Sequence, residues 1–234
     1  KTPSVLTTEL QSEGIDIHFE DFNSSIPSPY TNKDETLVII TPAVPKNLGE
    51  LMHFQFKEFE IVKRSEVLGL ITQESKGLGV AGTHGKTTTS TMLAYILDQS
   101  ETKCNAFLGG ISANFNSNLV LNASAEYTVI EADEFDRSFL RLSPFASIIT
   151  SADPDHLDIY GDASHFREGF EMYANLHPAD GFVIQRYGLN LPTNAQTFTY
   201  GVNEVEADFS AHNLRYENER FLMEYLSTTL PKGK

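Results

Sequence analysis

Short apolar stretches alternate with helical patterns along the first third of the chain. Four consecutive apolar residues at Leu37–Ile40 are typical of a buried parallel strand, and the prolines at positions 42 and 45 prevent it from continuing. The same patterns predict helices at residues 4–13, 48–57 and 65–75, and further strands at residues 15–19 and 60–63. Alternation of this kind with short links predicts an α/β unit with a parallel sheet.

A second α/β unit begins near residue 76. Residues 78–81 form a short apolar strand that leads into a glycine-rich turn, and a helix is expected over residues 87–99. We expect the inner face of this helix to carry the following residues: Met92, Leu93, Ile96 and Leu97. Further buried strands are predicted at residues 127–130, 147–150 and 182–185. We therefore divide the chain into two domains, residues 1–75 and 76–234.

The last part of the second unit combines an amphipathic helix with a hairpin. Phe166, Phe170 and Tyr173 recur at i, i+4 and i+7, which predicts a helix over residues 164–176 that buries one aromatic face. Residues 207–216 and 220–226 flank a polar tripeptide and predict an antiparallel hairpin. Residues 228–234 show no structural pattern, and we expect a frayed or spliced terminus there.

Composition narrows the classes of function. The 234 residues include 17 Lys and Arg against 32 Asp and Glu, a net charge of −15, which argues against a nucleic-acid partner or binding to an anionic membrane. No apolar run approaches the roughly 18 residues of a membrane span. The single cysteine, Cys104, cannot form an internal disulfide and fits a reducing cytosol.

A glycine-rich turn between a strand and a helix is the sharpest chemical feature. Its glycines let the backbone wrap an anion, and the following helix offers free N–H groups. Lys86 supplies a cation for the β- and γ-phosphates, and the Thr87 hydroxyl is placed to ligate Mg²⁺. Val80 stands where the strict P-loop pattern has its first glycine, so a glycine-rich helix start with a chance lysine remains the alternative. The predicted nucleotide-binding residues are Gly82, Thr83, His84, Gly85, Lys86, Thr87 and Thr88.

Acids and a histidine follow two of the predicted strands. Glu131 comes directly after the apolar run at 127–130, where a carboxylate can hold Mg²⁺ on the phosphates. His156 follows the strand at 147–150, and an imidazole there can ligate a second metal or orient an acyl phosphate. The alternatives are a solvated acidic loop and a structural histidine.

Taken together, these motifs resemble the ATP-dependent Mur ligases of peptidoglycan synthesis. The glycine loop, the acidic motif and the D-H-x-D motif occur in the order and approximate spacing of that family. The resemblance rests on residues 41–47 (TPAVPKN), 63–68 (KRSEVL), 79–89 (GVAGTHGKTTT), 107–110 (FLGG), 131–142 (EADEFDRSFLRL), 148–160 (IITSADPDHLDIY) and 199–201 (TYG).

The resemblance implies a fold and a domain organisation. Members of the family have a Rossmann-like domain for the UDP-sugar, a central ATPase domain and a second Rossmann-like domain. Residues 1–75 would be part of the first, and residues 76–234 an incomplete central P-loop domain with a mostly parallel sheet and a hairpin near its end. The UDP-binding glycine turn, the adenine-binding region and the third domain have no match, so we expect a fragment or a sequence with internal gaps.

The resemblance also implies a reaction and the residues that carry it. The pattern is most similar to members that join L-alanine to UDP-N-acetylmuramate through an acyl phosphate, with ATP and Mg²⁺, in the bacterial cytoplasm. Lys86 and His156 would be catalytic, and Thr87, Glu131 and His156 would hold metal. Thr41 and Arg64 are the candidates for binding the UDP-sugar, although Arg64 is equally explained as a surface cation.

Two other functions remain open at this point. A muropeptide-recycling ligase would join a tripeptide to the same sugar nucleotide. A non-catalytic nucleotide-binding module would need Lys86 but neither Glu131 nor His156, and the presence of both favours an enzyme.

Overall fold

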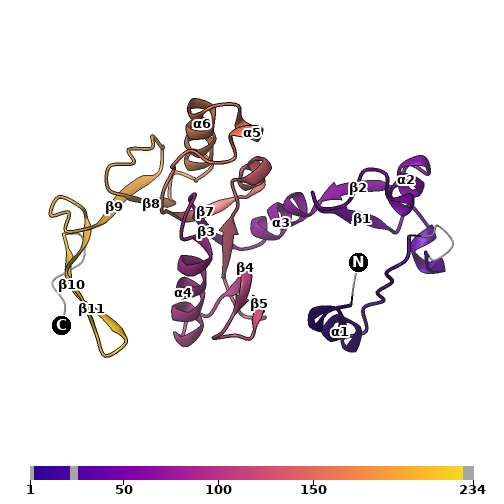
Figure 1. Ribbon diagram of the computed structural model, residues 1–234, viewed down its shortest axis with the longest axis horizontal. Coiled ribbons are helices and arrows are strands. Elements are labelled where there is room, and N and C mark those ends of the chain that lie inside the picture. The colour runs from indigo at the N-terminus through magenta and orange to yellow at the C-terminus, as the bar shows by residue number, and fades with distance from the viewer. Residues whose placement is uncertain (1–2, 22–25, 229–234) are drawn as a thin grey trace. The chain divides into compact units, whose positions relative to one another are not determined.

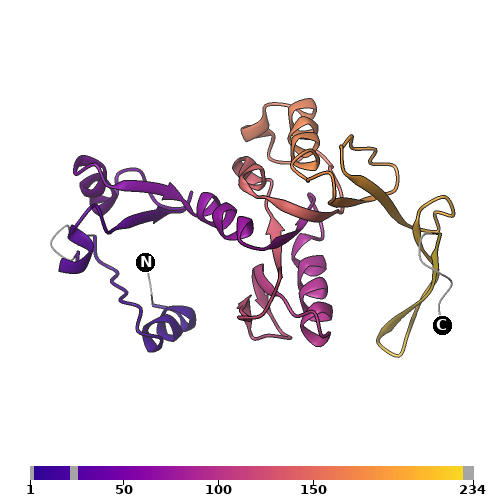
Figure 2. The ribbon, with the colours of Figure 1, turned by 180° about the vertical axis from the view of Figure 1, so that it is seen from behind.

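The computed structural model describes residues 3–21 and 26–228, which form two compact units (Figures 1 and 2). The first unit ends at Val67 and the second begins at Leu68, inside helix α3 (Arg64–Gln73). Within the described residues, no helix is both long and apolar enough to cross a membrane.

The first unit is built around two parallel strands. The strands β1 (Leu37–Ile40) and β2 (Glu60–Lys63) pair in parallel, with Ile40 opposite Lys63. The helices are α1 (Val5–Ser12), the 3-10 turn η2 (Ser28–Thr31), α2 (Gly49–Phe56) and the start of α3. Helix α1 begins at a capping box in which the Ser4 hydroxyl accepts from the Thr7 N–H and the Thr7 hydroxyl accepts from the Ser4 N–H.

The prediction of a strand at residues 15–19 is wrong. In the described part of the chain this segment pairs with no strand. The segment instead leads to Asp21, whose carboxylate accepts hydrogen bonds from the N–H groups of Gly49 (2.7 Å) and Glu50 (2.9 Å). These bonds satisfy the first donors of α2 and hold the pKa of Asp21 below its ordinary value. Residues 15–19 therefore form an extended link that leads to Asp21, the residue whose carboxylate caps α2.

The second unit is a mixed sheet with helices on both faces (Figure 1). Among the described residues its strand order is β11-β10-β9-β8-β7-β3-β6-β4-β5, and all neighbours are parallel except β4–β5 and β10–β11. The strands are β3 (Lys76–Ala81), β4 (Asn105–Ser112), β5 (Ser117–Val120), β6 (Tyr127–Ala132), β7 (Pro144–Ile149), β8 (Phe182–Arg186), β9 (Gln196–Val202), β10 (Phe209–Glu217) and β11 (Arg220–Ser227). The helices are α4 (Lys86–Gln99), the 3-10 segment η3 (Phe135–Arg141), α5 (Leu157–Tyr160) and α6 (Ala163–Ala174).

The expected α/β class, the mostly parallel sheet and the terminal hairpin are confirmed. Strand β3 lies between β6 and β7, with Ala81 opposite both Ala132 and Ile149. The carboxyl ends of these three parallel strands therefore meet at one edge of the sheet, which is where ligands bind in open α/β sheets.

Two apolar clusters form the core of the second unit. Helix α6 buries the predicted aromatic face completely, with Phe166, Phe170 and Tyr173 packed around Phe139 of η3. The other cluster lies under α4 and includes Ala94, Cys104, Ala106, Leu108 and Val129.

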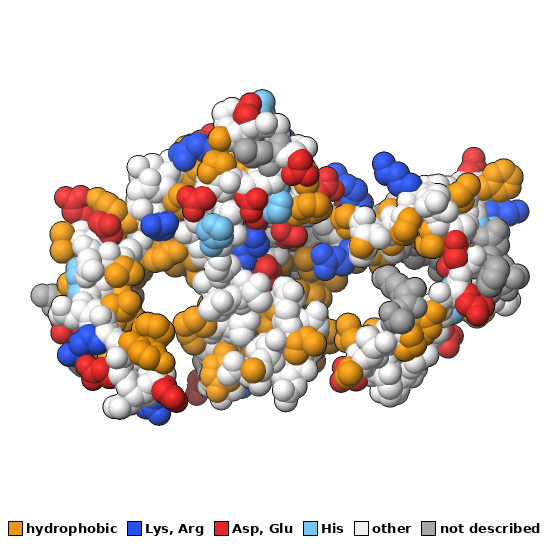
Figure 3. Space-filling model, viewed as in Figure 1, with side chains coloured by type: hydrophobic (Ala, Val, Ile, Leu, Met, Phe, Trp, Pro, Cys, Tyr) orange, Lys and Arg blue, Asp and Glu red, His pale blue; other side chains and the backbone are white. Residues whose placement is uncertain are grey.

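The inner face predicted for α4 is partly wrong. Met92 is 59% exposed and Ile96 is 62% exposed, whereas Ser90 and Ala94 are buried. Leu93 and Leu97 do pack against the core cluster as predicted, whereas Met92 and Ile96 point outward. Figure 3 shows such hydrophobic surface on α4 and on the hairpin, where Leu214, Tyr216, Phe221 and Met223 are exposed.

Candidate functional site

The loop between β3 and α4 has backbone geometry that only glycine adopts easily. Gly82 has φ 137°, and a Cβ there would lie 2.0 Å from the Thr150 hydroxyl oxygen. Gly85 has φ 80° and caps α4 without any side-chain hydrogen bond to the helix start. The first N–H groups of α4 are therefore left for an anion, as a phosphate loop requires.

The segment that follows β7 holds this loop in place by hydrogen bonds. The Thr83 hydroxyl donates to the Asp153 carbonyl (2.7 Å), and the His84 N–H donates to the Ser151 hydroxyl (3.0 Å). The Thr150 hydroxyl also donates to the His84 carbonyl. His84 is thus tied into the loop through its backbone, and the loop is held in shape before any ligand binds.

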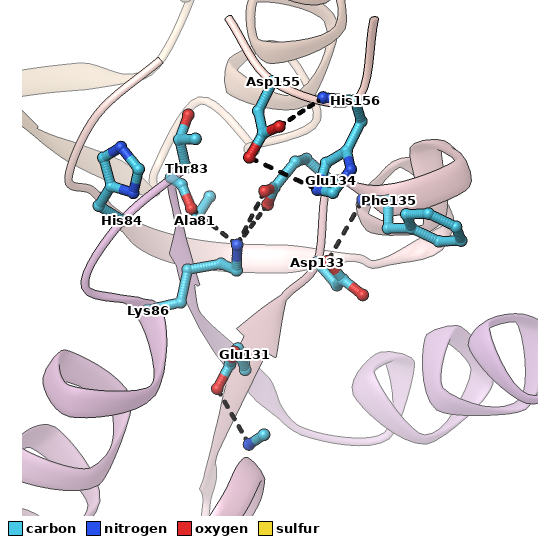
Figure 4. A network of polar contacts seen from close by, with 12 residues as sticks. Ala81, Thr83, His84, Lys86, Glu131, Asp133, Glu134, Phe135, Asp155 and His156 are labelled. Carbon is cyan, nitrogen blue, oxygen red and sulfur yellow. Dashed lines mark hydrogen bonds and ion pairs between the residues drawn. The ribbon is translucent and has the colours of Figure 1, made fainter. Parts of the chain in front are cut away.

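Lys86 is the first residue of α4, and its side chain reaches back to the loop, where it is already paired. Its Nζ donates to the Gly82 carbonyl (2.9 Å) and to both carboxylate oxygens of Glu134 (2.8 and 2.7 Å), as Figure 4 shows. Glu134 is only 1% exposed. In the sequence, Glu134 is one of four acids that follow a predicted strand, and no sequence feature distinguishes it as the partner of Lys86.

Glu131 lies at the end of β6, beside the first turn of α4. Its carboxylate accepts from the Thr87 hydroxyl (3.0 Å) and from the Gly109 N–H (2.9 Å). A Cβ on Gly109 would lie 2.3 Å from a Glu131 oxygen, so only glycine leaves room for this carboxylate. Sequence reasoning missed the role of Gly109, and its signal was the glycine pair of the FLGG motif.

Thr87 and Glu131 carry oxygen atoms of the kind that Mg²⁺ prefers as ligands. Among the described residues, no cluster of three or more His, Cys, Asp or Glu side chains is arranged to hold a metal ion. Thr87 and Glu131 supply two oxygens of the kind that Mg²⁺ takes in nucleotide sites.

His156 stands just before α5 with a left-handed backbone, φ 51°. Its ring meets the Phe135 ring edge to face with the ring centres 5.3 Å apart, and its backbone N–H donates to the Asp155 carboxylate (2.7 Å). The described contacts include no hydrogen bond from His156 to Thr87, Glu131 or Lys86. The structure therefore places the imidazole on the segment that also holds the phosphate loop, without joining it to the two proposed metal ligands.

Tyr160 joins the His156 segment to the acidic motif. Its hydroxyl donates to the Glu134 carbonyl (2.6 Å), and burial raises the pKa of Tyr160 to about 12, so it stays a donor at neutral pH. The Arg137 guanidinium lies 5.2 Å from the centre of the Tyr160 ring.

Thr41 and Arg64 belong to the first unit. They directly follow Ile40 and Lys63, which face each other in the parallel pair β1–β2, so both lie at the carboxyl edge of that sheet. Thr41 is half-buried and Arg64 is exposed.

Comparison with known proteins supplies the family. Residues 80–233 match the family described as the Mur ligase middle domain. The chain is 54% identical over 219 residues to UDP-N-acetylmuramate–L-alanine ligase of Parabacteroides distasonis, covering 92% of this chain and 47% of that protein. It is 47% identical over 223 residues to the enzyme of the same name from Porphyromonas gingivalis, covering 94% and 49%. The chain thus spans about half the length of the curated relatives it matches.

Solved structures agree with this result. UDP-N-acetylmuramate–alanine ligase MurC from Thermotoga maritima superposes with a TM-score of 0.79 at 25% identity, over 95% of this chain and 50% of that one. A UDP-N-acetylmuramate:L-alanyl-gamma-D-glutamyl-meso-diaminopimelate ligase from Neisseria meningitides superposes with a TM-score of 0.82 over 97% and 74%, but at 21% identity it supports the fold alone. Because the middle-domain match covers well over half of its residues, the chain belongs to the Mur ligase family.

Proposed function

We propose that this chain is part of an ATP-dependent ligase that joins L-alanine to UDP-N-acetylmuramate in peptidoglycan biosynthesis. The observation that carries the proposal is the phosphate loop, with Lys86 at the start of the helix that follows it and the Thr87–Glu131 pair beside it, at one sheet edge. The relatives at 44–54% identity are named UDP-N-acetylmuramate–L-alanine ligases, which supports L-alanine as the amino acid.

The reaction needs two transfers. The lactyl carboxylate attacks the γ-phosphorus of ATP, and ADP leaves with the electron pair of the broken P–O bond. The amine of L-alanine then attacks the acyl carbon, loses a proton and expels inorganic phosphate. Both steps call for charge stabilisation rather than a covalent enzyme intermediate. The loop N–H groups and Lys86 supply it at the phosphates.

A bound Mg²⁺ would neutralise part of the charge on the phosphates. Thr87 and Glu131 are the residues that would hold it, since their oxygens lie 3.0 Å apart at the loop. We assign His156 to the acyl-phosphate side, where it would serve a second metal or orient the phosphoryl group.

We assign the first domain, residues 1–75, to the UDP-sugar and the second, residues 76–234, to ATP. Thr41 and Arg64 at the carboxyl edge of β1 and β2 are the proposed sugar-nucleotide contacts. A cytoplasmic location follows from these substrates as part of the same proposal.

The test is phosphate release by a full-length protein that contains this sequence. UDP-N-acetylmuramate is supplied with L-alanine, glycine, L-serine or a tripeptide in separate reactions. The proposal expects the highest kcat/KM with L-alanine. Highest activity with the tripeptide would point to a muropeptide-recycling ligase, and ATP binding without turnover on any acceptor would point to a nucleotide-binding module.

A further inference from the structure

The ammonium group of Lys86 has no free donor in the described structure. An ammonium has three N–H donors, and the three contacts go to Gly82 and to both oxygens of Glu134 at 2.7–2.9 Å. A phosphate oxygen can reach this nitrogen only by replacing one of these acceptors. The smallest change is for Glu134 to keep one N–H and yield the other.

Glu134 is poorly able to move away. Its side chain is 2% exposed, and that of Lys86 is 14% exposed. Its backbone carbonyl accepts from the Tyr160 hydroxyl (2.6 Å) and from the Arg137 N–H (2.9 Å). A buried carboxylate that lost its cation would be strongly destabilising, so the pair should persist in some form when nucleotide binds.

We propose that Glu134 is a positioning residue that holds Lys86 over the phosphate loop and gives up one of its N–H donors to the terminal phosphate. Before the nucleotide binds, Glu134 orients the ammonium group of Lys86. When the nucleotide binds, Glu134 competes with the terminal phosphate for an N–H of that group. The inference rests on the proposed function for the identity of the nucleotide, ATP.

The first test is Glu134→Gln in a full-length protein that contains this sequence. Glutamine keeps the shape and one acceptor oxygen but loses the charge. We expect kcat to fall about 10–100-fold, the range for a misplaced catalytic group, with the KM for the amino acid unchanged. The matched control is Glu126→Gln, because Glu126 pairs with Lys76 (2.6 Å) at the start of β3, the end opposite the loop. The control should keep wild-type kcat, and an equal kcat for both variants would overturn the proposal.

The second test is a double-mutant cycle with Lys86→Ala. If Glu134 acts through Lys86, then Glu134→Gln should cause no further loss of residual activity in the Lys86→Ala background. It should also raise the melting temperature there, because it removes a buried carboxylate that has lost its partner. Additive losses of rate, or a melting temperature lowered in both backgrounds, would mean a merely structural role. This comparison remains informative if Glu134→Gln alone is unstable.

The third test separates this inference from the proposed function. The affinities of a full-length protein that contains this sequence for ATP and AMP are measured directly, without acceptor or amino acid. Since AMP lacks the phosphates that reach Lys86, Glu134→Gln should tighten ATP binding and leave AMP binding unchanged. ATP binding that does not tighten relative to AMP would contradict the exchange of donors. These outcomes hold even if no acceptor substrate supports turnover.

Discussion

Gly109 controls the position of the Glu131 carboxylate at the scale of single residues. A Cβ at this position would lie 2.3 Å from a Glu131 oxygen, whereas a Cβ at the neighbouring Gly110 would lie at an ordinary 3.7 Å from Thr87. We therefore expect Gly109→Ala to displace Glu131 and raise the Mg²⁺ concentration needed for half-maximal activity. Gly110→Ala is the matched control and should leave the Mg²⁺ titration unchanged. Identical titration curves for the two variants would contradict this account.

Lys86 is the residue on which phosphoryl transfer should depend most. Removing one such stabiliser of transition-state charge typically lowers the rate by about 10²–10³-fold. We expect Lys86→Ala to lose turnover by at least that factor while circular dichroism still shows a folded protein. A folded variant with near-normal phosphate release would remove Lys86 from the mechanism.

The sequence identified single residues where a motif carried the chemistry. The loop glycines and Lys86 could be predicted because few other functions need that pattern between a strand and a helix. Glu134 and Gly109 could not, because each is defined by a partner 48 or 22 positions away along the chain. Such contacts depend on the order and register of β3, β4 and β6, which local patterns do not give.

At the scale of elements, α6 is joined to β7 by a chain of buried hydrogen bonds. The Tyr173 hydroxyl and Ser147 Oγ are 2.8 Å apart, Ser147 Oγ and His177 Nε2 are 2.8 Å apart, and His177 Nδ1 lies 3.0 Å from the Ala174 carbonyl. With Nδ1 protonated, His177 donates to Ala174 and accepts from Ser147, so the ring is neutral. Burial lowers the pKa of His177 below its ordinary value of 6.5.

This neutral histidine predicts a loss of stability in mild acid. His177 binds a proton more readily in the unfolded chain than in the folded one. Its contribution to the free energy of unfolding is therefore complete above pH 6.5 and falls as the pH drops below that value. We expect urea unfolding to show lower stability at about pH 5.5 than at about pH 7.5, with a smaller difference in His177→Gln. Asp162, with its pKa lowered to about 2 by the Ser164 hydroxyl and the His165 N–H, acts only in stronger acid. An unchanged pH dependence in His177→Gln would contradict the assignment.

Element types were predictable where periodicity was strong. The helix α6 and the strands β3, β6, β7 and β8 follow their patterns closely. Strand β1 has the predicted bounds and parallel pairing, but the expectation that it is buried is wrong, because Leu37 and Ile39 are exposed. Strand β4 was missed because Gly109 and Gly110 resemble a loop. Strand β9 was missed because polar residues interrupt its apolar ones, so that no apolar run stands out. Residues 15–19 show the opposite error, since a strand needs a neighbour that the local sequence cannot reveal.

At the scale of the whole molecule, the structure divides into two compact units inside α3, whereas the domain boundary after residue 75 stays a prediction from the succession of motifs. A continuous helix carries no local signal of where one set of contacts ends and another begins. The roles given to the two units remain predictions. So does the fate of residues 229–234, which lie outside the described residues.

The 234-residue chain by itself should bind nucleotide weakly and fail to catalyse the reaction. An amide-forming ligase must hold three reactants in line and exclude water, and this chain spans about half the length of its relatives. We expect nucleotide binding through the phosphate loop, with phosphate release at background even with UDP-N-acetylmuramate and L-alanine present. Substrate-dependent turnover by the purified chain would show that this half is sufficient.

Oxygen isotopes test whether ATP phosphorylates a carboxylate at the phosphate loop, as we propose. A full-length protein that contains this sequence is supplied with ATP, L-alanine and UDP-N-acetylmuramate whose lactyl carboxylate is enriched in ¹⁸O. If an acyl phosphate forms, one carboxylate oxygen leaves with the phosphoryl group, and the released phosphate carries a single ¹⁸O. Released phosphate without ¹⁸O, alongside amide product, would contradict the account.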